Sequence, residues 1–195
     1  YLMKQLLTAF VVMLLLPVSA FAEDFDTSQH NLKLRIGEYE IESRQEINSD
    51  KDHIQVGRDI GDKANVQLRY VDTDDAEWRA RVTLDVLRFG DFYAKQRVEF
   101  RHFQTEKDYW RVRPILGYNI VHTPTLKLFT EFQGSFNFGK DGEDNDFKLD
   151  NGQWKIGADY RINNFTTIGP FVQYEHDKDF NKDALFLGTT LKLEF

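Results

Sequence analysis

The chain has 195 residues, a net charge of -7, no cysteine, and 41% hydrophobic against 29% charged residues. The lack of cysteine excludes disulfides and a lipid-anchored cysteine, and the acidic balance argues against a nucleic-acid-binding protein. Mean hydropathy is -0.53 and no segment after the first 22 residues has the long apolar run of a transmembrane helix, yet the aromatic content reaches 14%.

The first residues are typical of a secretory signal peptide. A basic Lys4, an apolar run over 6–16 and a small-x-small sequence at 20–22 follow one another. The apolar run is shorter than the about 20 residues of a spanning helix. We therefore expect a signal peptide over 1–22 and one exported β-domain over 23–195.

The exported part contains repeated segments in which apolar and polar residues alternate with period two, which is typical of β-strands with two different faces. The segments are joined alternately by tight turns and by longer charged links. This alternation predicts an all-β, transmembrane, antiparallel up-and-down barrel of about ten strands, with eight or twelve as alternatives and both termini at the periplasmic end. The predicted strands are 30–41, 53–60, 64–72, 76–89, 91–104, 108–121, 124–139, 152–163, 166–176 and 183–195.

The stretch 77–121 contains three consecutive strands with an apolar face and an arginine-bearing face. A membrane barrel explains this pattern, because its apolar face contacts acyl chains and its polar face lines the lumen. In the first predicted strand the apolar phase changes near Gly37, which indicates a bulge. The lumen-facing bases that we single out are Arg79, Arg81, Arg97, Arg101, Arg111, Arg113, Lys95 and Arg161.

Aromatic residues lie at the ends of these predicted strands, on the apolar face. Amphipathic rings collect at membrane–water interfaces, so we expect two girdles that contact outer-membrane lipid and lipopolysaccharide. The girdle residues are Tyr70, Trp78, Trp110, Phe138, Trp154 and Tyr174 at the outer end and Phe195 at the inner end.

The last strand, ALFLGTTLKLEF, ends in Phe195 and carries leucines on the same face. It resembles the C-terminal signal of Gram-negative outer-membrane proteins. The resemblance implies recognition by the barrel-assembly machinery and a location in the outer membrane of a Gram-negative bacterium.

Two interpretations of the arginines remain open. Guanidinium groups bind carboxylates bidentately and keep their charge, which suits a channel that passes anionic solutes. Alternatively, the arginines fill a small barrel by pairing with Glu99, Asp85, Glu131 and Asp159. The predicted excess of bases over acids favours anion binding, because an unpaired buried charge is costly.

The stretch RVEFRHFQTEKDYWRVRPILGYN resembles the oligogalacturonate-specific porins of Gram-negative bacteria. The resemblance implies a monomeric channel that passes acidic sugar oligomers, with Arg97, Arg101, Arg111 and Arg113 in the pore wall. Those porins have twelve strands against the ten predicted here, and residues 40–62 have room for one more hairpin.

Catalytic groups and metal ligands are sparse. His176-Asp177 beside Glu175 is the best acid–base candidate, and Ser135 is a serine well inside a predicted strand. The acidic loop 140–151 lacks the spacing of an EF-hand and is expected to be solvated. We expect no enzyme, no cofactor and no metal site. The alternative function is a closed structural or adhesive barrel with acidic surface loops and no transport.

Overall fold

The computed structural model describes residues 26–47, 51–139 and 148–195, so the predicted signal peptide and most of the loop 140–151 lie outside the described residues. No helix in the described ranges is long and apolar enough to cross a membrane.

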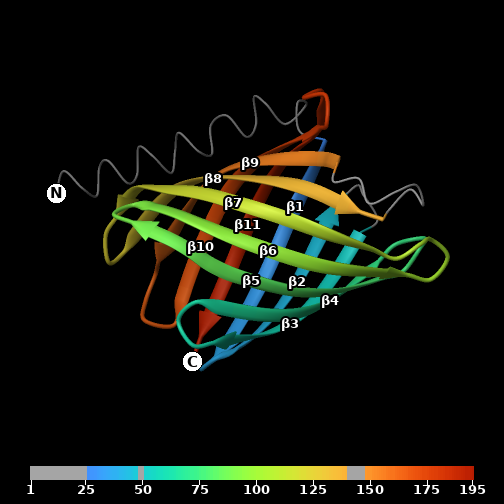
Figure 1. Cartoon of the computed structure of the whole chain (residues 1–195). Helices are drawn as coiled ribbons and strands as arrows, with labels where there is room; N and C mark the ends of the chain where they lie inside the picture. Colours follow the sequence, from blue (N-terminus) through green and yellow to red (C-terminus); the bar gives the residue numbers. More distant parts are fainter. Residues whose placement is uncertain (1–25, 48–50, 140–147) are drawn as a thin grey trace.

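The described chain consists of strands joined by turns and loops (Figure 1). Strands predicted from alternation recur with ends shifted by up to about four residues, as usual for strand boundaries. The strands are β1 (Thr27–Ile36), β2 (Tyr39–Ile47), β3 (Lys51–Ile60), β4 (Ala64–Asp72), β5 (Glu77–Phe89), β6 (Phe92–Phe103), β7 (Tyr109–His122), β8 (Leu126–Phe138), β9 (Lys148–Arg161), β10 (Thr166–Asp177) and β11 (Lys182–Glu194).

These elements form one closed barrel in the order of the chain, with every sequential pair antiparallel. The barrel closes through β1 and β11, which run parallel, with Thr27 opposite Phe186 and Arg35 opposite Glu194. The all-β barrel is therefore confirmed, with eleven strands within the described residues, close to the ten expected.

The additional strand, β2, begins at Tyr39, two residues after Gly37. We expected one strand over 30–41 with a bulge, but the chain reverses at Gly37–Glu38 and β2 pairs with β1, Ile36 opposite Tyr39. Gly37 has φ +57°, a left-handed conformation that tight hairpin turns require and glycine adopts at little cost. A turn and a bulge both change the apolar phase, which is why the prediction was wrong at this position.

The two ends of the barrel differ. The turn-side end carries the short reversals at Gly37, Gly61 and Gly90, and the loop-side end carries the longer links, including 73–76 and 104–108. Phe195 lies at the turn-side end, where its backbone N donates to Arg35 O at 2.9 Å (Figure 1).

The first described strand begins instead at the loop-side end, because β1 and β11 are parallel. The expectation that both ends of the barrel sequence lie on one side is therefore wrong. An odd number of strands places the start of the first and the end of the last at opposite rims.

The faces of the wall follow the predicted alternation. Large apolar side chains project outward and are exposed, such as Ile54 at 54%, Val56 at 50% and Leu68 at 45%. Most buried residues of the wall are polar and face the lumen, among them Gln55, Arg69 and Glu99. The core of this barrel is thus a polar interior enclosed by an apolar exterior.

Candidate functional site

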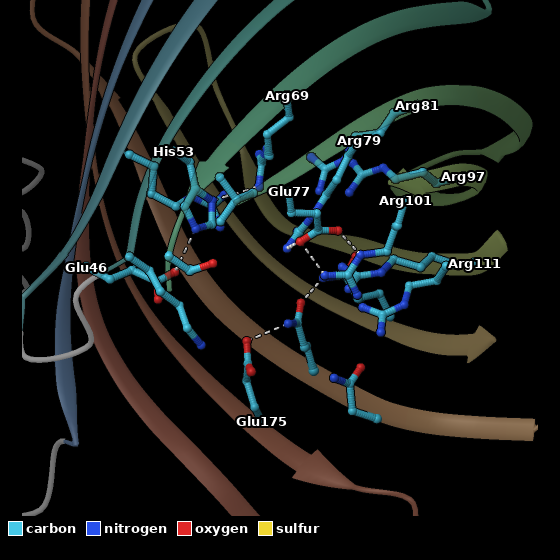
Figure 2. A pocket seen from close by; sticks show the side chains of 18 of the residues that line it. Glu46, His53, Arg69, Glu77, Arg79, Arg81, Arg97, Arg101, Arg111 and Glu175 are labelled. Atoms are coloured by element: carbon cyan, nitrogen blue, oxygen red, sulfur yellow. Dashed lines mark hydrogen bonds and ion pairs between the residues drawn. The ribbon is translucent and has the colours of Figure 1, made fainter. Parts of the chain in front are cut away.

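A cavity of about 890 Å³ occupies the loop-side half of the lumen (Figure 2). Figure 2 shows guanidinium groups converging on it from neighbouring strands, with Glu46, His53 and Glu175 on its other sides. Its eight arginines are Arg44, Arg69, Arg79, Arg81, Arg97, Arg101, Arg111 and Arg113. The six arginines predicted on β5, β6 and β7 are thus brought together in one cavity.

Strand register explains why these arginines converge. Arg79 lies opposite Arg101 and Arg97 lies opposite Arg113, so like charges face one another across neighbouring strands. Directly opposed residues on one face have Cβ atoms about 5 Å apart, and like charges there repel. The arrangement therefore requires carboxylates close by.

Glu99 supplies one of them at the centre of the wall. It is fully buried, with Arg81 Nε 3.0 Å and Arg113 Nε 3.8 Å from its two carboxylate oxygens. Two guanidinium groups thus share one carboxylate, and the cluster keeps an excess of positive charge.

A second ion-pair group lies nearer the loop-side rim. Glu77 accepts from Arg79 Nη2 at 2.7 Å and from Arg101 through two nitrogens. Arg111 donates to Asn137 Oδ1 at 2.7 Å and to Asp150 Oδ2 at 2.6 Å. These arginines are held in place by carboxylates and amides of the wall.

Glu42 plays the corresponding role on β2. Its carboxylate lies 2.8 Å from Lys33, 3.5 Å from Arg44 and 4.0 Å from Arg69. Residues 42–52 were expected to be a loop, so Glu42 and Arg44 were missing from the predicted lumen. Glu46 has the same phase on β2 and also borders the cavity, so these positions add two acids and one base, and the excess of bases in the lumen is smaller than the sequence predicts.

Arg97 differs from its neighbours. Its Nε donates to Thr83 Oγ1 at 3.1 Å, and within the described residues no carboxylate lies within ion-pair distance of it. Its side chain is half-buried and lines the cavity. Arg97 therefore presents a guanidinium charge that an anionic solute could neutralise.

A row of amides on β8, β9 and β10 also lines the cavity. Gln133 donates to Gln153, Gln153 donates to Glu175, and Gln173 donates to Glu175 at 2.8 Å. None of these glutamines was predicted to line the lumen, although the alternation of their strands places them on the inward face. The cavity thus combines charged donors with neutral hydrogen-bonding groups.

The two remaining predicted lumen bases lie outside this cavity. Lys95 is on the same wall, nearer the turn-side end, and its Nζ is 3.2 Å from Asp85 Oδ1. Arg161 is exposed at the turn-side end of β9, opposite Thr167. Neither is among the residues that border the arginine cavity.

The turn-side half of the lumen is narrower and partly aromatic. Tyr93, Phe129 and Phe171 point inward from β6, β8 and β10, and each lies against the glycine directly opposite on the next strand. A second cavity of about 120 Å³ borders Phe129 and Phe171. The glycines remove Cβ atoms that would overlap the rings, so the rings lie along the wall.

Predicted girdle residues lie on the outer face, where neighbouring strands pair their rings. Centroids are 5.0 Å apart for Tyr70 and Trp78, and Trp154 lies 4.6 Å from Phe132. Trp110 lies opposite Phe138, and Trp154 lies opposite Tyr174. Phe195 is 69% exposed at the turn-side end, stacked on Phe165.

The catalytic candidates are not assembled into a pair. Ser135 Oγ and His176 Nε2 are buried, and neither has a hydrogen-bond partner within the described residues. His176 instead stacks on Phe180, with 4.7 Å between centroids. No group of three or more metal-ligating side chains occurs in the described ranges.

Comparison with protein-family models finds no match, and comparison with curated proteins finds none either. Among solved structures the chain is similar to one described as outer-membrane expressed OmpT of Vibrio cholerae, at 10% sequence identity and a TM-score of 0.35. The match covers 76% of this chain and 58% of that protein. At this TM-score the likeness supports no conclusion about fold or function.

Proposed function

We propose that this chain is an outer-membrane β-barrel. Its strands close on one another, so the wall has no edge with unpaired backbone groups, as hydrocarbon requires. Its outer face exposes large apolar residues such as Ile156 at 63%, and the rings of Trp78 and Trp110 lie near the loop-side end. In water so large an apolar surface favours association, whereas in lipid it is solvated.

We further propose that the barrel is a narrow, monomeric channel that prefers anionic solutes. The observation that carries this proposal is the cavity of about 890 Å³ in which eight arginines converge and Arg97 has no carboxylate within ion-pair distance among the described residues. Repeated cationic groups attract an anion and let it pass from one to the next.

Acidic oligosaccharides are the solute class that this lumen suits best. Carboxylates match guanidinium forks such as that of Arg97, and sugar hydroxyls match neutral amides such as Gln133 and Gln153. The two kinds of group line the same cavity, and a solute that carries both chemistries contacts both.

A closed barrel with a structural or adhesive role is the second candidate. The narrow turn-side half favours it, since the cavity there is only about 120 Å³ and cations such as Lys192 and Lys95 are neutralised by Asp159 and Asp85. In such a barrel the arginine cavity is a blind pocket open at the loop side.

Single-channel recording of the refolded protein in a planar bilayer, with a salt gradient across it, separates these candidates. We expect an anion-selective current that becomes several-fold less selective when Arg97 and Arg113 are changed to Gln, because anion preference follows the charge lining the pore. Arg58→Gln is the matched control, because Arg58 is exposed and pairs with Glu38 outside the cavity.

Heat-modifiable electrophoretic mobility establishes that each variant is folded before recording. Folded protein that carries no current at any voltage contradicts the channel and leaves the closed barrel. A cation-selective or unselective current contradicts the role of the arginines.

A further inference from the structure

The partition between the two lumen cavities is made of cationic side chains. Three residues border both the loop-side cavity and the turn-side cavity: Lys33, Arg44 and Lys155. A solute that passes from one of these cavities to the other meets these three side chains.

Two of these three cations are fixed by a carboxylate. Glu42 lies 2.8 Å from Lys33 Nζ and 3.5 Å from Arg44 Nη2, and its own side chain is buried. Buried pairs of this kind resist separation, because parting them leaves an uncompensated charge inside the wall.

Lys155 is held differently. Within the described residues no carboxylate lies within ion-pair distance of its ammonium, which instead sits 3.7 Å from the centroid of the Phe171 ring. Glu131 is opposite Lys155 in the register, but its carboxylate accepts from the Tyr93 hydroxyl at 3.0 Å. A cation–π contact is weaker than a buried ion pair, so Lys155 is the cation of the partition that is most easily moved.

The ring under Lys155 is itself fixed. Phe171 is 3% exposed and lies directly against Gly188 on β11, while its Cβ is 3.2 Å from the position that a Cβ on Gly157 would occupy. The ring cannot move further toward the wall, and its face remains turned to the lumen. Lys155 therefore rests on a ring that is packed against the wall at the junction of the two cavities.

We propose that Lys155 and Phe171 form a gate in the anion path, a subsite in which the carboxylate of an incoming solute draws the ammonium off the ring. The proposal rests on the proposed channel function and names the residue that controls it. A solute carboxylate in the loop-side cavity offers Lys155 a counter-charge at ion-pair distance, which no carboxylate of the described wall supplies. Movement of the side chain then joins the two cavities.

Lys155→Met tests the gate, because it keeps an unbranched side chain and removes the charge. In planar bilayers we expect the chloride-to-potassium permeability ratio to fall about threefold or more, and the current carried by sodium glucuronate to fall with it. Lys155→Arg retains the charge and the cation–π contact, and we expect it to stay within about twofold of the wild type. If Lys155 has a purely structural role, Lys155→Met and Lys155→Arg are expected to have the same ion selectivity.

Lys127→Met is the matched control. Lys127 Nζ also lies over aromatic rings, 5.4 Å from Phe129 and 5.8 Å from Tyr93, but Lys127 is not among the residues that border the two cavities. We expect the chloride-to-potassium permeability ratio of Lys127→Met to match that of the wild type. Equal losses in Lys127→Met and Lys155→Met overturn the gate, because a general loss of lumen charge then explains both.

Phe171→Ala separates the gate from the channel. It removes the platform and widens the junction, so we expect about a twofold rise in conductance. A conducting wild type with unchanged Lys155→Met and Phe171→Ala overturns the gate and leaves the channel. A folded wild type that stays silent in sodium glucuronate overturns both proposals, because no solute carboxylate then opens the lumen.

Discussion

The loop-side half of the lumen is lined by guanidinium and amide groups around about 890 Å³, whereas the turn-side half holds aromatic rings and lysines around about 120 Å³. In the loop-side half two arginines share Glu99 and Arg97 pairs with no carboxylate of the described residues. In the turn-side half Lys95 and Lys192 each pair with an aspartate. One barrel thus contains a part with a guanidinium charge that no described carboxylate pairs with and a part whose charges are largely neutralised.

This difference follows from how each half fills its space. Aromatic rings that lie over glycines occupy the turn-side wall and leave little volume for a solute. Arginines extend from the loop-side wall into the cavity, where Glu77 and Glu99 offset part of their mutual repulsion. Packing dominates one half and electrostatics the other.

Glu99→Gln is expected to have the largest effect, because it removes the carboxylate shared by Arg81 and Arg113. Breaking a buried ion pair in this way costs about 3–5 kcal/mol in the free energy of unfolding. Urea titration of the barrel refolded in lipid vesicles measures it. Glu175→Gln is the control in the same half, since Glu175 accepts hydrogen bonds from Gln153 and Gln173. Equal destabilisation by both variants contradicts the central role of Glu99.

Gly117→Ala tests the packing of the turn-side half. An added Cβ overlaps the ring of Tyr93, and overpacking of this kind costs about 1–3 kcal/mol. Urea titration of Gly117→Ala, Tyr93→Leu and the double variant gives the coupling between the sites. The double variant should be more stable than the sum of the single effects predicts, because the smaller side chain relieves the overlap. If the effects of Gly117→Ala and Tyr93→Leu on the free energy of unfolding are strictly additive, the packing of the Tyr93 ring does not depend on Gly117.

Arg97→Gln separates binding from stability in the loop-side half. Since Arg97 has no carboxylate partner among the described residues, we expect the free energy of unfolding to change by less than about 1 kcal/mol. Block of the chloride current by glucuronate should nevertheless weaken several-fold. If Arg97→Gln instead lowers the free energy of unfolding strongly and leaves the block by glucuronate unchanged, Arg97 stabilises the wall and does not bind the solute.

The smallest effect on stability is expected at Asp26, which lies at the loop-side end of the β1–β11 pair that closes the barrel. Its carboxylate accepts from Leu185 N at 2.6 Å and lies 3.1 Å from Lys182 Nζ, and these contacts lower the pKa of Asp26 from its usual 3.8. A carboxyl whose pKa is lower in the folded state than in the unfolded state stabilises the fold at pH values above the unfolded-state pKa. This stabilisation is lost as the pH falls through the folded-state pKa.

We therefore expect Asp26→Asn to lower the urea midpoint slightly at pH 7 and to leave it unchanged at the acidic end, below the folded pKa. Because the group is exposed, the difference is small. If the urea midpoints of the wild type and Asp26→Asn differ by the same amount at both pH values, the ionised Asp26 carboxylate does not contribute to stability.

Much of the wall could be predicted from alternation alone. Period two assigns each residue of a strand to one of two faces, so Arg79, Arg81 and Arg97 were predicted on the lumen side before any partner was known. The same rule predicted the outward rings of Trp78, Trp110 and Trp154, which are 45–53% exposed.

Alternation failed where a turn and a bulge leave the same signature. At Gly37 the apolar phase changes in either case, and the hairpin that forms there brings Glu42 and Arg44 into the lumen. The acids that neutralise part of the basic lumen were consequently missed. The strand count, and with it the parallel closure of β1 on β11, could not be settled from the sequence.

By itself, then, the sequence determined a β-barrel with an apolar outside and a basic inside, because face assignment is a local property of each strand. The tertiary structure decided which charges meet: Glu99 between Arg81 and Arg113, and Lys155 on Phe171. Contacts inside a barrel depend on the number of strands, their stagger and the closing pair. Those quantities emerge only when the whole wall is assembled.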